Sequence, residues 1–148
     1  MLKENYNINI IGKQFYEESS GAEPGEITLS TTGTYTERGG AEFIAYKEYD
    51  EDDPKVAYTS VLKIEPGRVT MMRSGSSTRL ILEQGKRHLC LYDTGYGMMS
   101  VGVFTSELHS SLRKEGGRLN VKYTLDIDSN LSSRNEIEVE IKPCGVSC

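Results

Sequence analysis

Alternation of apolar and polar residues near the C-terminal end restricts the fold of this 148-residue chain more than any other feature. The segments RLNVKYTLDID (118–128) and NEIEVEIK (135–142) place an apolar side chain at every second position: Leu119, Val121, Tyr123, Leu125, Ile127, Ile137, Val139 and Ile141. Successive side chains of a β-strand point to opposite faces, so this period of two predicts strands with one buried face and one face in water.

The same pattern extends towards the N-terminus in further segments. It predicts additional strands at about residues 5–14, 26–37, 42–49, 55–64, 68–73, 78–83, 86–93 and 97–105. Turn signals rich in glycine or proline separate them at residues 38–40, 65–67, 74–77, 84–85 and 116–117. Residues 106–114 fit either a short helix or a strand, and we favour a strand that pairs with 118–128 through the Gly-Gly turn.

About ten strands joined mostly by short turns, without a convincing helix of three turns, predict an all-β antiparallel fold. Consecutive hairpins can hide their exposed edges by closing on themselves. An up-and-down closed barrel of about eight to ten strands is therefore favoured over a Greek-key sandwich. The length is that of a single domain, 1–148, with a core over about 5–143 and a tail at 144–148.

Charge and hydropathy argue against two classes of partner. The formal net charge is −5 and the sequence pI is near 5.1, which leaves no basic stripe to neutralise nucleic-acid phosphates. No apolar stretch approaches the roughly 20 residues of a membrane helix, and the N-terminus MLKENYNINIIGK lacks the apolar core of a signal peptide. We therefore expect a cytoplasmic protein that binds neither nucleic acid nor membranes.

The three cysteines predict neither a disulfide framework nor a metal site. Cys90 lies within a predicted strand, whereas Cys144 and Cys148 lie in the C-terminal tail. A structural zinc site needs four ligands at tight spacing, and His88 and His109 do not supply the missing pair. We expect three reduced thiols, no metal and no cofactor.

Four segments in a fixed order carry a resemblance to a known family: TGTYTERGGAEFIAYKE, TSVLKIEPGRVTMMRSG, LILEQGKRHLCLYDTGYGMMSVGVFT and GGRLNVKYTLDIDSN. With this order the chain resembles, from about Ile8 to Ile141, the YwiB-like family of small bacterial proteins of unknown function. Each motif is weak by itself, but their order is more specific. The resemblance implies a lipocalin-like (calycin-like) β-barrel and supplies no reaction.

The most distinctive segment of that family is similar to Tyr-x-Thr-Pro-Tyr-Gly followed by a threonine. The matching residues in this chain are Tyr92, Thr94, Tyr96, Gly97 and Thr105. Position 95 is glycine where the family pattern has proline, so the fixed φ of proline is lost and the turn is more permissive.

Inward-facing positions of such a barrel predict an interior of mixed polarity. Two strands would turn the following residues inward: Ile27, Leu29, Thr31, Gly33 and Tyr35, and Gly97, Met99, Val101, Val103 and Thr105. The glycines leave space, and the threonines bring polar groups that need partners when buried. Of the adjacent pairs Met71-Met72 and Met98-Met99, only one methionine each can face the interior.

A set of polar residues is the candidate ligand site: Tyr46, Glu48, Arg73, Tyr92, Thr94 and Tyr96, together with Thr105. Apolar walls with a few convergent polar groups are the usual form of a small-molecule site. Arg73 could pair with a ligand carboxylate, and the tyrosine hydroxyls could orient the ligand. The alternative is that Glu48 and Arg73 form an ion pair at the rim and that the tyrosines are core aromatics.

Three functions fit these observations. The first is a non-enzymatic barrel that binds a small apolar or amphipathic molecule in its lumen or mouth. The second is a small-molecule enzyme, decarboxylase-like by fold analogy alone, with Tyr46, Glu48, Arg73 and Tyr92 in its site. The third is a structural or protein-interaction module, as a monomer or homodimer. The sequence contains no catalytic motif and His88 is interpreted as structural, so we name no catalytic residue and favour the first function.

Overall fold

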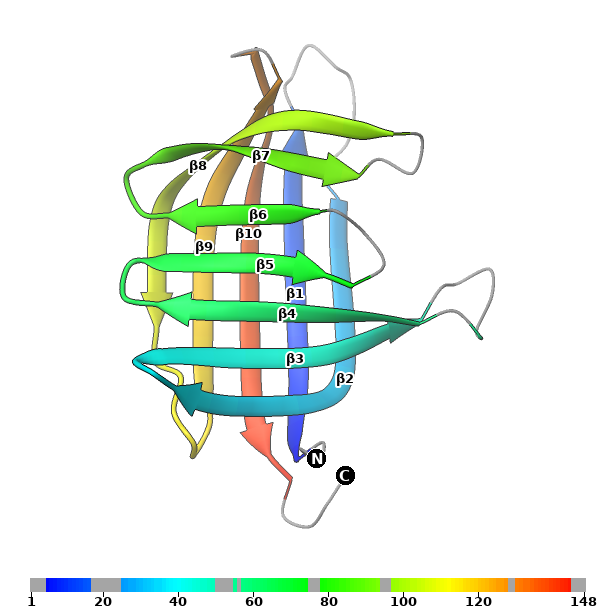
Figure 1. The fold of residues 1–148 in the computed structure, drawn as a ribbon, viewed down its shortest axis with the longest axis vertical. Helices are drawn as coiled ribbons and strands as arrows, with labels where there is room; N and C mark the ends of the chain where they lie inside the picture. The colour runs from blue at the N-terminus through cyan, green and yellow to red at the C-terminus, as the bar shows by residue number, and fades with distance from the viewer. Residues whose placement is uncertain are drawn as a thin grey trace.

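The computed structural model describes residues 5–16, 25–49, 55, 57–74, 78–93, 97–127 and 130–144. Within these residues ten strands follow one another (Figure 1): β1 Tyr6–Tyr16, β2 Gly25–Arg38, β3 Ala41–Tyr49, β4 Ala57–Glu65, β5 Arg68–Arg73, β6 Arg79–Glu83, β7 Arg87–Asp93, β8 Met98–Ser110, β9 Gly117–Ile127 and β10 Asn130–Pro143. Each strand pairs with the next, and β1 pairs antiparallel with β10, which closes the barrel. The predicted all-β, up-and-down closed barrel is confirmed.

Alternation sorts the side chains of β9 and β10 between the barrel interior and the outer surface, as predicted. Leu119 and Val121 of β9 and Val139 and Ile141 of β10 are almost completely buried. Leu119 lies directly opposite Val139 in the ladder, so the two strands contribute to one continuous core. Burying each such aliphatic side chain stabilises the fold by about 1.5–3 kcal/mol before the entropy of ordering is subtracted.

The barrel is flattened into two layers whose strands cross at a steep angle (Figure 1). Strands β3 to β7 form one layer, and β9, β10 and β1 run across behind them. The long strands β2 and β8 bend at the corners and contribute to both layers. Orthogonal packing of this kind requires bends or bulges in the strands that pass from one layer to the other.

The corner of β2 lies at Gly33, where the strand changes neighbours. The preceding residues of β2 pair with β1 and the following residues pair with β3, while Gly33 itself lies between Tyr6 and Tyr46. A Cβ atom at this position would overlap the carbonyl oxygen of Ala45 and would lie 2.6 Å from Cδ1 of Ile8. The missing side chain therefore allows the close approach that the corner needs.

The corner of β8 is marked by a register shift between Thr105 and Glu107. The strand continues beyond the shift to Ser110, so most of the ambiguous segment 106–114 is strand, as we favoured. The predicted strand ended at 105 because the extra residue interrupts the alternation: Thr105 and Leu108, three positions apart, are both buried.

An ion pair crosses the outer surface of the barrel over Gly102 of β8. Arg87 of β7 donates hydrogen bonds to both carboxylate oxygens of Asp126 on β9, over 2.9 Å from Nε and 2.6 Å from Nη2. A Cβ atom at Gly102 would lie 2.5 Å from Arg87 Nε and 2.5 Å from Asp126 Oδ2. The bare glycine backbone thus lets two strands that are not neighbours share a bidentate pair.

We expect Gly102→Ala to separate Arg87 from Asp126 and to lower the free energy of unfolding, because a bidentate ion pair is lost. Urea unfolding measures the change, since guanidinium chloride would screen the charges. In a double-mutant cycle, Arg87→Met should cost clearly less in the Gly102→Ala background than in the parent protein. Strictly additive effects would contradict this account.

The two ends of the barrel differ in their connections. At the end that holds Tyr6 and Pro143, tight turns join the strands; in one of them Gly67 follows Pro66 and has a φ of 74°, as a type II turn requires. At the opposite end, β1 finishes at Tyr16 and β3 at Tyr49. We call this opposite end, where β1, β3, β5, β7 and β9 finish, the mouth.

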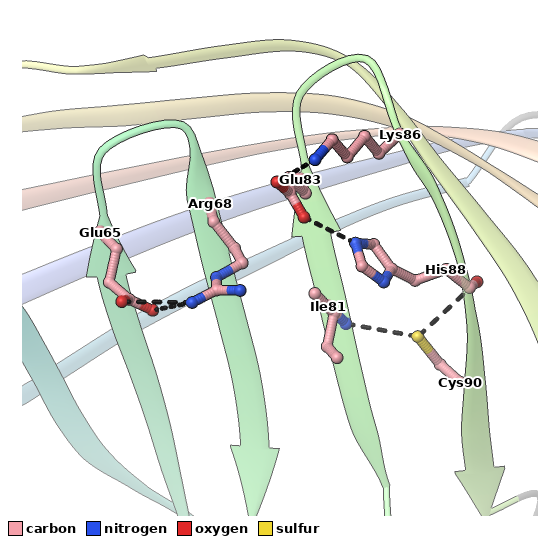
Figure 2. Close-up of polar contacts among 7 residues, drawn as sticks. All are labelled: Glu65, Arg68, Ile81, Glu83, Lys86, His88 and Cys90. Carbon is pink, nitrogen blue, oxygen red and sulfur yellow. Dashed lines mark hydrogen bonds and ion pairs between the residues drawn. The ribbon is translucent and has the colours of Figure 1, made fainter.

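Within the described residues, the ladder between β6 and β7 pairs one position, Arg79 with Leu91. Figure 2 shows the side chains that bridge the rest of this seam: the amide nitrogen of Ile81 donates to Sγ of Cys90 over 3.4 Å, and Nε2 of His88 lies 2.9 Å from Oε1 of Glu83. Hydrogen bonds with His88 and Lys86 hold the pKa of the Glu83 carboxyl below its usual value. His88 therefore has a structural partner at the end of the barrel remote from the mouth.

The C-terminal segment corrects one prediction. Cys144 is disulfide-bonded, and among the described residues Cys90 is the free, buried cysteine. The expectation of three reduced thiols is therefore wrong for Cys144, because wide cysteine spacing excludes a framework of several disulfides but not a single bond. The backbone nitrogen of Cys144 also donates to the carbonyl oxygen of Asn5 over 2.9 Å, which holds the end of the barrel domain beside β1.

Candidate ligand site at the barrel mouth

A cavity of about 360 Å³ opens between the strands at the mouth. Its apolar wall is formed by Leu80 of β6, Leu125 of β9 and Ile137 of β10, which all face the interior. Small-molecule pockets are typically about 300–1,000 Å³, so this cavity suits a ligand at the small end of that range. A neighbouring hollow of about 410 Å³ shares Tyr123, Asn135 and Glu136 with this cavity, but it extends over the outward-facing Lys122 and Arg134 instead of the apolar wall.

The rim of the mouth exposes large apolar and aromatic side chains at inward-facing positions. Ile27 of β2 is 76% exposed, Tyr92 of β7 is 41% exposed and Tyr16 of β1 is 39% exposed, and all three line the cavity. Ile127, at the end of β9, is also exposed. Apolar surface gathered at a concave site, rather than scattered singly, is typical of a binding site.

One wall of the cavity is polar and internally hydrogen-bonded. The hydroxyl of Tyr16 donates to Oε1 of Gln14 over 2.7 Å, and Nε2 of Gln14 donates to Oγ of Ser133 over 3.4 Å. On β10, Nδ2 of Asn135 donates to the same serine oxygen over 3.1 Å. Because β1 and β10 are paired here, with Gln14 opposite Asn135, the network fixes both amides at the edge of the cavity.

Two tyrosines complete the cavity on the opposite strands. Tyr123 of β9 is buried, and Tyr92 of β7 lies at the rim. Burial, together with the nearby Tyr92, raises the pKa of Tyr123 to about 12. Its phenol therefore remains protonated at physiological pH and acts there as a neutral hydrogen-bonding group.

The predicted residues Tyr46, Glu48 and Arg73 do come together, on β3 and β5. Nη2 of Arg73 lies 2.6 Å from Oε2 of Glu48, and the hydroxyl of Ser60 donates to the same oxygen over 3.2 Å. The guanidinium carbon of Arg73 also lies 5.6 Å from the centre of the Tyr58 ring. This is the ion pair that we considered as the alternative interpretation, and it uses the charge of Arg73 within the protein.

Tyr46 is buried beside this ion pair. Burial, followed by the charge of Glu48, raises the pKa of Tyr46 to about 12, while a hydrogen bond with Ser60 and the charge of Arg73 act in the opposite direction. Tyr46 is therefore a core residue whose hydroxyl stays protonated and neutral at physiological pH.

The remaining predicted residues have different positions. Tyr92 lines the mouth cavity and makes no hydrogen bond to Tyr46, Glu48 or Arg73. Thr105 is completely buried opposite Tyr123, below the cavity lining, and within the described chain its Oγ1 has no hydrogen-bond partner. Thr94 and Tyr96, like Gly95, lie outside the residues that the structure describes.

Sequence reasoning missed Gln14, Ser133, Asn135 and the cavity role of Tyr123. A signal was present, because the alternation of NEIEVEIK continues upstream at inward positions to Asn135 and Ser133, where polar residues replace the apolar ones. Polar side chains on the buried face of a strand mark the end of a dry core.

Within the described residues, no group of three or more His, Cys, Asp or Glu side chains could hold a metal ion. The part of the chain that the structure describes also contains no helix with the length and apolar character needed to cross a membrane.

Comparisons with known proteins agree with this architecture. The model of the domain of unknown function DUF1934 matches residues 8–139. The uncharacterized β-barrel protein YwiB of Bacillus subtilis strain 168 is 26% identical over 129 residues, which cover 85% of this chain and 86% of that protein. The crystal structure of the ywiB protein from B. subtilis superposes with a TM-score of 0.76 at 20% identity, over 97% of this chain and 94% of that one, and so shares its fold. Because the family model spans nearly the whole barrel, this chain belongs to the DUF1934 family, in agreement with the YwiB-like resemblance of its sequence.

Proposed function

We propose that this protein binds a small, partly apolar molecule at the mouth of its barrel, without transforming it. The observation that carries the proposal is the cavity of about 360 Å³, with an apolar wall on one side and hydrogen-bonding groups on the other. Lipocalin-like barrels hold one small ligand in an opening of this kind, and we propose the same use of the fold here.

Electrostatics favours binding over catalysis at this site. General acid–base catalysis works best with a group whose pKa is near the working pH. The pKa of Tyr123 is raised to about 12, so its phenol stays protonated at neutral pH. It can donate a hydrogen bond there but is a poor general acid or base. The enzymatic alternative would need Glu48 or Arg73 to engage a substrate, whereas these side chains bind each other at 2.6 Å.

Gly12 provides a direct test, because it lines the cavity and a Cβ atom at this position would meet nothing within 4 Å. We expect Gly12→Leu to fill the cavity while the barrel still folds. Native mass spectrometry of protein purified from its own cell extract should show a bound small molecule in the parent protein and a several-fold smaller bound fraction in Gly12→Leu.

Asn120→Leu is the matched control, since Asn120 is exposed on the outer face of β9 and the substitution leaves the cavity unchanged. Circular dichroism establishes that both variants are folded. The proposal is refuted if the parent protein carries no small molecule and takes up none from the extract, or if Gly12→Leu carries as much as the control.

A further inference from the structure

The described residues of the inner wall of the mouth cavity present neutral groups. Lys13, Glu26 and Glu136 border the cavity, but they lie in a row on the outer face, where Lys13 of β1 pairs with Glu26 of β2 on one side and with Glu136 of β10 on the other. Their neighbours Gln14 and Gly12 take the inward positions of β1. An ionised ligand group inside would lose its water without gaining an opposite charge from these walls.

Among the described residues, the inward-facing charges of the same end, those of Arg73 and Glu48, are already paired. Arg73 and Glu48 lie 2.6 Å apart, and the side chain of Glu48 is only 25% exposed. A ligand carboxylate could recruit Arg73 only by leaving Glu48 partly buried without its cation. Breaking the Arg73–Glu48 pair would cost more free energy than a new pair between Arg73 and the ligand at the exposed rim would supply. The geometry therefore argues against an anionic ligand.

The neutral polar side chains of the cavity, in contrast, have hydrogen-bonding atoms without a partner among the described residues. Nδ2 of Asn135 is bonded to Ser133, but the side-chain carbonyl of Asn135 accepts no hydrogen bond from any described residue. The hydroxyls of Tyr92 and Tyr123 likewise have no hydrogen-bond partner among the described residues. Asn135 and Tyr123 are both at least nine-tenths buried and both line the cavity, so a ligand group that both donates and accepts would satisfy their unpaired atoms there.

We infer that the ligand of this site is an uncharged amphipathic molecule. Its apolar body lies against Leu80, Leu125 and Ile137, and a hydroxyl or amide group bonds Asn135 and Tyr123. This inference rests on the proposed function, since it concerns the same cavity, and it adds the charge class of the ligand and the residues that recognise the polar end.

Three probes of equal chain length and different charge test the inference: 1-octanol, octanoate and octylammonium, titrated at neutral pH and measured by calorimetry and by amide chemical shifts. We expect 1-octanol to bind at least about tenfold more tightly than either ion, because only the ions must bury an unpaired charge. Gly12→Leu should abolish the binding, which assigns it to the mouth.

Asn135→Leu should weaken 1-octanol binding about tenfold by removing the acceptor, and Tyr123→Phe, which deletes only a hydroxyl, should weaken it to a similar extent. Asn120→Leu, on the outer face, should bind like the parent protein. If an ion binds as tightly as the alcohol and is displaced by Gly12→Leu, the inferred charge class is wrong and the proposed function stands. If none of the three binds at the mouth, and the extract yields no ligand, both are wrong.

Discussion

Replacing Gly33 by alanine is expected to destabilise the protein by about 3 kcal/mol, although only one methyl group is added. The new Cβ atom would overlap the carbonyl oxygen of Ala45, a backbone atom that cannot rotate away. It would also lie 2.6 Å from Cδ1 of Ile8, a completely buried side chain with little room to move. Relief would require β2 and β3 to separate at the corner where β2 changes layers. Denaturant unfolding followed by circular dichroism measures the loss.

Gly12→Ala is the matched control for Gly33→Ala. Both glycines face inward on neighbouring strands, but a Cβ atom at Gly12 would meet nothing within 4 Å. We expect this variant to stay within about 0.5 kcal/mol of the parent protein. Equal losses for the two variants would show that strand propensity alone, and not the close approach at the corner, explains the requirement for Gly33.

Alkaline pH is expected to unfold the protein through its buried tyrosines. The pKa of Tyr46 and that of Tyr123 are each raised from 10.0 to about 12, in both cases mainly by burial. The folded state therefore holds these two protons more tightly than the unfolded state does. The resulting stability is fully present below pH 10 and is lost as the pH rises towards 12, on the order of 2–3 kcal/mol for each residue.

Parallel titrations of tyrosinate absorbance and circular dichroism measure this effect. Burial also raises the pKa of Tyr6 and Tyr35, so four of the nine tyrosines should ionise late and together with unfolding. Tyr123→Phe removes one of these groups and should move the alkaline midpoint to higher pH. Ionisation of all nine tyrosines near pH 10, with the barrel intact, would contradict the burial that the structure assigns to them.

Local signals were sufficient to predict the strands. Strand β5 has the predicted bounds of 68–73, and the inward positions from Leu29 to Tyr35 of β2 follow the expected alternation. Each methionine pair divides between the faces, since Met71 and Met99 pack against the core. These features depend on periodicity and turn chemistry within a few residues, which a single sequence displays directly.

The site was predicted less completely, because it depends on which strands meet at the mouth. Grouping Tyr92 with Glu48 and Arg73 assumed that β3, β5 and β7 converge on one ligand, whereas the cavity combines Tyr92 with residues of β1 and β10. Asn135 and Gln14 become neighbours only through the pairing of the first and last strands. Such non-local pairing, and the tilt of a flattened barrel, have no signature in one sequence.

The pairing of β1 with β10 also has a consequence for how the chain reaches its native state. Tyr6 lies opposite Pro143, so the contact that closes the barrel joins residues near the two ends of the chain. During synthesis the sheet can grow hairpin by hairpin, but β1 keeps one unpaired edge until the last strand leaves the ribosome. High contact order of this kind makes closure a slow, late step. Glu136, Glu138 and Glu140 give the outer face of β10 a negative charge. Charged side chains on an unpaired strand disfavour its pairing with another chain before the barrel closes.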